Sequence, residues 1–170
     1  ELGQLLGWVV GDGWVSQETP ADRTVPNFTV GMTLGGEEKK TLAPRFQALI
    51  KEWTGLEGSA IERNGVLSLH YKSSLYYFLR SLGLGEQDGL KKEVPESLWR
   101  APREAVVGFL RALFTADGTV NRSFVKGSCT VRLANSSRAL LQQVQLMLLN
   151  EKIVAKLYLR RSKSKRWMPD

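Results

Sequence analysis

An apolar segment that ends in Asp-Gly occurs twice in the chain, and the two copies align without a gap. The first copy spans residues 5–13 and the second spans residues 110–118. Both belong to a row of small residues at every fourth position: Gly3, Gly7 and Gly11 in the first copy, and Gly108, Ala112 and Ala116 in the second. Residues four apart lie on one ridge of an α-helix, and a ridge of Gly and Ala lets two helices approach closely. The duplication therefore predicts two helices packed side by side in a chain of two related halves.

The aspartates of the two segments, Asp12 and Asp117, stand where a negative charge is unfavourable. We expect Gly13 and Gly118 to end the helices in the left-handed conformation. The carboxylates then lie at C-terminal helix ends, where the helix dipole disfavours an anion by about 0.3–1 kcal/mol. Two carboxylates at one site also repel, unless cations compensate or one takes up a proton. This repeated placement of like charges predicts a site for divalent cations.

These segments resemble the two motifs of LAGLIDADG homing endonucleases in the two-motif, single-chain form. The sequence departs from the family name at Val10 and Thr115, whereas the second acid of the motif is present in both copies. The resemblance implies an α+β fold, in which an αββαββα half is repeated about a pseudo-twofold axis and antiparallel sheets form a saddle over DNA. We assign the first half-domain to residues 1–100 and the second, incomplete at its C-terminus, to residues 101–170.

The resemblance also implies an activity, the site-specific cutting of both strands of DNA by a water activated at Mg²⁺. Asp12 and Asp117 are then the catalytic metal ligands, and the backbone carbonyls of Gly11 and Ala116 complete the coordination. Mn²⁺ or Ca²⁺ can substitute in such a site. The expected partner is double-stranded DNA with a long, imperfectly symmetric target, bound by a monomer with internal pseudo-twofold symmetry.

A lysine near the second motif resembles a catalytic residue of the intein-type members. In those members a lysine precedes an Ile/Val-Pro pair, and the segment Lys92-Glu93-Val94-Pro95 matches this pattern, with Lys91 as the alternative. The implied role is to order the attacking water and to stabilise charge on the phosphate. The second half has no counterpart within the chain, so either Lys163 or Lys165 serves there or the half continues further. The residues that splice an intein are absent, so we expect an endonuclease domain that does not splice.

Alternation of apolar and polar side chains predicts half-buried strands over residues 27–34, 60–71, 128–133 and 156–160, the second being a hairpin with an Asn64-Gly65 turn. Helices are expected from Glu37, Ser73 and Ser136-Ser137, with the serines as caps. The polar strand faces predict a DNA-binding surface, because the major groove admits a β-ribbon and Lys and Arg neutralise phosphates. The candidates for DNA contact are Asn27, Thr29, Arg63, Asn64, His70, Asn121, Arg122, Arg132, Lys156, Arg160, Arg161, Lys163 and Lys165.

Composition narrows the function classes only slightly. A net charge of +7 is compatible with a polyanionic partner. The single cysteine, Cys129, excludes an internal disulfide, and its phase in the alternation predicts a core position. Only one histidine, His70, is present, which argues against a Cys/His zinc site. No apolar run is long enough to span a membrane and no signal peptide is visible, so we expect a cytoplasmic protein without a membrane partner.

Two other functions remain open. One is a DNA-binding regulator or RNA maturase that keeps the fold without cutting, which the retention of both motif aspartates disfavours. The other is a basic two-repeat protein in which Gly and Ala only pack helices and the polar faces are simply solvated. The second predicts that Mg²⁺ does not bind at Asp12 and Asp117.

Overall fold

The computed structural model describes residues 1–158, apart from residues 20, 23, 86–87 and 124–126. The first half follows the expected αββαββα order. Its elements are α1 (Leu2–Asp12), β1 (Gly13–Glu18), β2 (Asn27–Leu34), α2 (Glu38–Thr54), β3 (Ser59–Arg63), β4 (Val66–Tyr71) and α3 (Ser73–Ser81). The α+β fold class is confirmed. The boundary between half-domains after residue 100 stays a prediction.

The second half repeats only the first four elements within the described residues. A short 3-10 helix, η1 (Glu96–Arg100), leads into α4 (Arg103–Asp117), β5 (Gly118–Ser123), β6 (Ser128–Leu133) and α5 (Arg138–Asn150). The strand expected over residues 156–160 is wrong for its described part: residues 156–158 form no strand, and the Leu157 side chain, expected inward, is 43% exposed. In the first half the hairpin of β3 and β4 extends the sheet, because β4 pairs with both β2 and β3. In the described part of the second half, no second hairpin extends the pair of β5 and β6 in this way.

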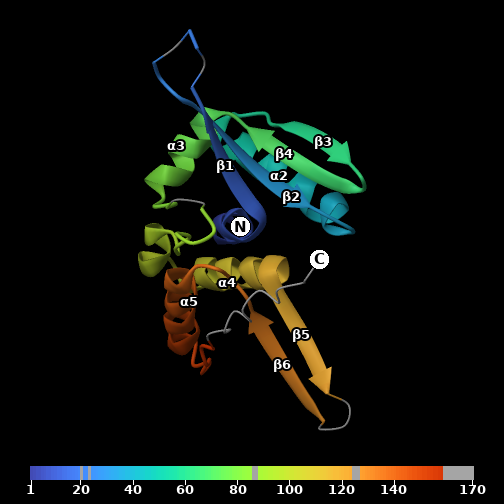
Figure 1. The fold of residues 1–170 in the computed structure, drawn as a ribbon, viewed down its shortest axis with the longest axis vertical. Coiled ribbons are helices and arrows are strands. Elements are labelled where there is room, and N and C mark those ends of the chain that lie inside the picture. Colours follow the sequence, from blue (N-terminus) through green and yellow to red (C-terminus); the bar gives the residue numbers. More distant parts are fainter. Residues whose placement is uncertain (20, 23, 86–87, 124–126, 159–170) are drawn as a thin grey trace, which may run out of the picture.

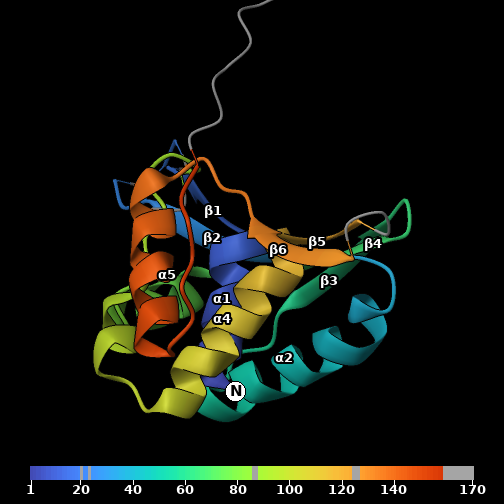
Figure 2. The same ribbon diagram turned by 90° about the horizontal axis from the view of Figure 1, so that it is seen from below.

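Two antiparallel sheets flank the central helices. One sheet has four strands in the order β1-β2-β4-β3, and the other consists of β5 and β6. In Figure 1 the two sheets project in opposite directions from α1 and α4, which cross the middle of the molecule next to each other. Figure 2 shows α2 on the far side of the larger sheet from its open face. The arrangement gives each half a sheet with one face turned away from the helices.

The contact between α1 and α4 is made by the small-residue ridge, as expected. A methyl group built on Gly7 would lie 2.4 Å from the carbonyl oxygen of Phe109, and one built on Gly3 would lie 2.0 Å from that of Ala105. At Gly11 the same methyl would lie 2.6 Å from the Cβ of Ala116. Any larger side chain would push the helices apart. From Leu5 to Val10 the apolar side chains of α1 are at most 1% exposed, so this helix forms the centre of the core.

The glycines that follow the helices have a different role from the expected one. Gly13 has φ −87° and Gly118 has φ −87°, so neither is left-handed, and each begins a strand directly after its helix. A methyl on Gly13 would lie 2.3 Å from the carbonyl oxygen of Val9. Glycine is required here by space, because the chain folds back against the last helical turn. Because each strand follows its helix directly, Asp12 and Asp117 lie at the junction between a helix and a strand.

Two further expectations about single side chains are wrong. Cys129 is exposed, because it lies on the two-stranded β5-β6 sheet, where the inner positions of both strands are exposed. Ser73 does not cap α3; its hydroxyl group bridges the backbone N–H and carbonyl of Phe28 in β2. The Asn64-Gly65 turn is confirmed, with φ of 52° and 78°. Ser137 caps α5 by accepting a hydrogen bond from the Leu140 N–H.

Among the described residues no helix is both long enough and apolar enough to cross a membrane.

Candidate functional site

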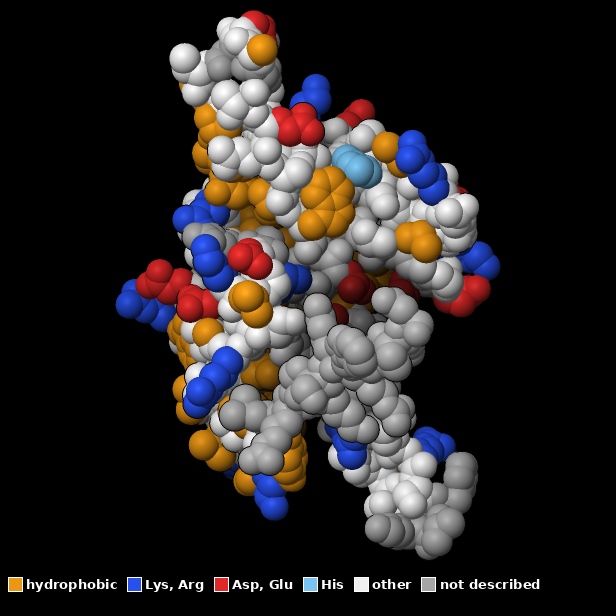
Figure 3. Space-filling model, in the orientation of Figure 1, with side chains coloured by type: hydrophobic (Ala, Val, Ile, Leu, Met, Phe, Trp, Pro, Cys, Tyr) orange, Lys and Arg blue, Asp and Glu red, His pale blue; other side chains and the backbone are white. Residues whose placement is uncertain are grey.

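The C-terminal ends of α1 and α4 bring Asp12 and Asp117 together. Burial raises the pKa of the Asp12 carboxyl above its ordinary value, and the charges of Asp117 and Glu38 raise it further, while Lys92 opposes them. The two carboxylates are therefore close enough to repel, as the duplicated motifs predicted. The space-filling view shows acidic side chains near the middle of this face, at the junction of the two halves (Figure 3).

Lys92 reaches this junction from the loop before η1. Its side chain is buried, with 9% exposed, whereas the alternative Lys91 is exposed. The ammonium group donates hydrogen bonds to the carbonyl oxygens of Val10 at 2.7 Å and of Gly11 at 2.8 Å. Burial lowers the Lys92 pKa, and the nearby charges of Asp117 and Asp12 act in the opposite direction. The lysine thus binds the orphan carbonyls at the end of α1 and places a cation beside both acids.

Two polar residues of the loop between β6 and α5 complete the cluster, and their roles at the site were not predictable from the sequence. The Asn135 amide donates to a carboxylate oxygen of Asp117 at 3.1 Å, and its own carbonyl oxygen accepts from the Ser137 N–H at 2.9 Å. The Ser137 hydroxyl donates to the carbonyl oxygen of Lys92 at 2.6 Å. The helix cap at Ser137 was visible in the sequence, but no local pattern links Asn135 to Asp117.

The oxygen atoms of this cluster fit a hard divalent cation. Within the described part of the chain, no lysine or arginine forms an ion pair with Asp12 or Asp117. No third acidic, histidine or cysteine side chain joins them in a cluster among these residues. The Gly11 carbonyl keeps one lone pair beyond its bond to Lys92. Two carboxylates with adjacent carbonyls suit Mg²⁺, which takes oxygen ligands and keeps several waters.

Most predicted DNA contacts in the first half share the open face of the larger sheet. Asn27 and Thr29 lie on β2 and alternate in phase with Gly31, which pairs with His70 of β4. Arg63 ends β3 on the same face, and Asn64 forms the adjoining turn. Side chains directly opposite each other in antiparallel strands lie on one face. The sheet therefore collects these five residues as the sequence predicted.

The second half collects fewer of them. Asn121 pairs with Thr130 and Thr119 pairs with Arg132, so Asn121 and Arg132 share one face of β5-β6. Arg122 pairs with Cys129 and so lies on the opposite face. Lys156 is exposed in the segment after α5, outside any strand. The remaining candidates lie outside the described residues, and these are Arg160, Arg161, Lys163 and Lys165.

The open face of the larger sheet also carries apolar side chains that the sequence analysis did not select. Trp14 of β1 lies across Gly31, where a methyl group would come within 2.2 Å of the indole ring. The same ring contacts His70 edge-on, with centroids 5.2 Å apart. Figure 3 shows this histidine in pale blue beside a hydrophobic ring. Ile61 and Val66 share this face, next to Arg63.

Comparisons with known proteins identify the fold, and a family model matches part of the chain. A structure of mesophilic variants of the homing endonuclease I-DmoI matches with a TM-score of 0.72 and 20% identity, over 96% of this chain and 83% of that chain. I-DmoI in complex with DNA and Mn matches with a TM-score of 0.70 and 20% identity, over 94% and 81%. A family model described as a LAGLIDADG-like domain matches residues 104–169. Residues 104–169 thus match the LAGLIDADG family, and the chain as a whole shares the fold of I-DmoI.

This chain also matches segments of larger proteins. The DNA polymerase of Thermococcus hydrothermalis is 31% identical over 151 residues, which are 87% of this chain and 8% of the relative. The glutamine–fructose-6-phosphate aminotransferase of Methanocaldococcus jannaschii is 23% identical over 171 residues, which are 98% of this chain and 14% of the relative. The chain thus spans only a small part of relatives whose named activities are unrelated. This distribution is typical of an inserted element, and it agrees with the intein-type motif at Lys92.

Proposed function

We propose that the chain is a site-specific endonuclease that cuts both strands of DNA with a divalent cation, and that this cation is Mg²⁺. The observation that carries this proposal is the junction of α1 and α4, where Asp12 and Asp117 approach each other beside the buried ammonium group of Lys92. Acids placed at two helix C-termini destabilise the fold unless a cation binds there. The two acids therefore do not contribute to the stability of the fold, and their placement is explained by a function in metal binding.

In this proposal Asp12 and Asp117 hold the metal from the two halves, with the carbonyls of Gly11 and Ala116 beside them. The bound metal supplies a positive charge that activates a water and stabilises the phosphate. Asn135 holds one oxygen of Asp117, so that carboxylate presents its other oxygen in a fixed direction. Lys92 keeps its ammonium group at the end of α1 and attracts the scissile phosphate.

The two sheets supply the binding of the DNA. Their open faces carry polar side chains of a size and type that address base edges in the major groove, and the chain has a net charge of +7. Arg63 and Asn64 at one hairpin, and Asn121 and Arg132 on the other sheet, are the contacts we favour. Because the two halves differ in sequence, the target is long and only partly symmetric. One chain provides both halves, so the active species is a monomer.

The neighbours support the choice of partner and cofactor. I-DmoI, whose fold this chain shares, has been seen in complex with DNA together with Mn. The occurrence of related segments inside relatives of unrelated activity supports an endonuclease domain that resides within an intein.

A cleavage selection tests the proposal. The purified chain is incubated with a plasmid library that carries a randomised insert, with Mg²⁺ or with EDTA, and the cut ends are sequenced. We expect one family of sites cut on both strands, only in the presence of the metal. Asp12→Asn and Asp117→Asn should bind the selected site without cutting it. Asp88→Asn, which alters an exposed loop acid, is the matched control and should cut normally.

The outcomes separate the alternatives. Specific binding without cutting by the unaltered chain would favour a DNA-binding regulator, and preferential retention of structured RNA would favour a maturase. Cutting by Asp12→Asn would overturn the metal assignment. If neither binding nor cutting occurs and Mg²⁺ does not raise the melting temperature, the two-repeat protein without a metal site is the better description.

A further inference from the structure

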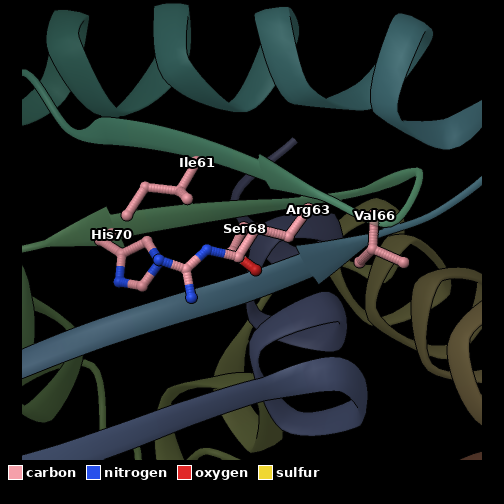
Figure 4. A pocket seen from close by; sticks show the side chains of 5 residues that line it. All are labelled: Ile61, Arg63, Val66, Ser68 and His70. Carbon is pink, nitrogen blue, oxygen red and sulfur yellow. The ribbon is translucent and has the colours of Figure 1, made fainter.

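The open face of the β3-β4 hairpin contains two apolar side chains where a DNA-binding surface is expected to be polar. Ile61 is 42% exposed and Val66 is 38% exposed. With Arg63, Ser68 and His70 they line an open hollow of about 410 Å³. Figure 4 shows these five side chains together on one face of the two strands. The hollow therefore combines two branched apolar side chains with one permanent cation.

Packing inside the protein does not account for these two side chains. The core face of β4 is formed by Leu67, Leu69 and Tyr71, which alternate with the residues of the hollow. β-branched residues favour strands, but Thr would meet that preference on a solvated face as well as Ile or Val does. Ile61 pairs with Ser68 and Val66 pairs with Arg63, so the two apolar groups are neighbours on adjacent strands. Together they form an apolar surface, and a partner that excludes water from it lowers the free energy.

We propose that Ile61 and Val66 select thymine by packing on its 5-methyl group in the major groove. This inference rests on the proposed function, and it names the base that the hairpin prefers. The 5-methyl group of thymine is the apolar feature of the major-groove edges, and Ala, Thr and Phe side chains are known to contact it. The other three bases lack this methyl group. Against apolar side chains, their hydrogen-bond donors and acceptors would lose their bonds to water and gain no partner in return. Arg63 lies next to the contact and attracts the DNA backbone.

The inference is tested by removing the methyl group from the DNA. Duplexes that bind the full chain are first enriched from a randomised pool in a buffer with Ca²⁺. Each thymine of the selected site is then replaced by deoxyuridine, one position at a time, and affinities are measured by competition. We expect affinity to fall about fourfold at each contacted position, since a buried methyl group is worth about 0.8 kcal/mol. At all other thymines the replacement should have no effect.

Variants of the chain assign the effect to the hollow. In the Ile61→Ser/Val66→Ser double variant, whose side chains carry no methyl group that could pack on thymine, the preference for thymine over deoxyuridine should fall to about one at those positions. Val131→Ser is the matched control, because Val131 is an exposed strand valine, 60% exposed, on the face of β6 opposite Arg132. It should leave the preference unchanged.

Three results would overturn the inference. If no duplex is enriched, the proposed function fails together with it. If a site is enriched but deoxyuridine binds as well as thymine at every position, only the thymine assignment fails. The same is true if the double variant keeps the full preference.

Discussion

Replacing Asp12 by Asn should make the protein more stable while it abolishes metal binding. Asp12 ends α1, where the helix dipole opposes a negative charge, and Asp117 lies close enough to raise its pKa. Asn keeps the shape of the side chain and removes its charge. We expect a gain in the free energy of unfolding of about 0.5–1 kcal/mol at neutral pH, since the exposed carboxylate is partly screened by solvent. For a chain of this size that gain is a rise in melting temperature of about 1–4 °C.

The pH dependence follows from the direction of the pKa shift. The Asp12 pKa is raised above 3.8 in the folded state, so the folded protein binds more protons than the unfolded chain between 3.8 and that raised value. The stability of the unaltered protein therefore falls as the pH rises through this window. Asn does not titrate, and so the gain of Asp12→Asn should be present above the window and vanish below 3.8.

Thermal unfolding followed by circular dichroism, at several pH values and with or without Mg²⁺, measures both effects. Mg²⁺ at about a hundred times its dissociation constant should stabilise the unaltered protein by about 2.7 kcal/mol and the variant by much less. Glu104→Gln is a control of opposite sign, because Glu104 lies in the first turn of α4, where the dipole favours an acid. A variant that is less stable at neutral pH, or that shows the same gain at low pH, would refute this account of the site.

Four further substitutions test three separate contacts. Lys92→Met leaves two carbonyl oxygens at the end of α1 without their donor, so urea unfolding should show a loss of about 2–4 kcal/mol; a change below about 0.5 kcal/mol would contradict the buried role of the lysine. Gly7→Ala should lower stability by about 2 kcal/mol or more, because its methyl group would meet a carbonyl oxygen of α4 at 2.4 Å. A methyl group on Gly108 would lie 3.4 Å from its nearest neighbour, the backbone nitrogen of Gln4, so Gly108→Ala should leave stability unchanged or raise it by up to about 1 kcal/mol through helix propensity. Equal effects on stability at the two glycines would refute the close contact. Asn135→Ala frees the carboxylate of Asp117 and should lower the cleavage rate at least about tenfold at saturating DNA, with no change in the melting temperature beyond about 4 °C; unchanged cleavage would exclude a positioning role.

Features that depend on a short stretch of chain were predictable. The four-residue spacing of small residues specifies one helix ridge, and two such ridges pack on each other regardless of the rest of the fold. The Asn64-Gly65 turn and the Ser137 cap are likewise set by backbone preferences of the residues themselves. The wrong expectations arose where a local pattern had two explanations. Gly13 was expected to supply a left-handed cap, but it supplies space beside Val9, and both roles require the same residue.

The sequence by itself determined that the chain has two related halves, a helix pair joined by its smallest residues, and an acid at the end of each helix. Only the tertiary structure decided which lysine reaches those acids, that Asn135 holds Asp117, and that Ile61 and Val66 lie exposed beside Arg63. The physical reason is that helix ridges and turns arise from neighbours along the chain, whereas the contacts of Lys92 and Asn135 join residues that are 82 and 18 positions apart. Their geometry exists only after the sheets have paired and the two halves have packed together.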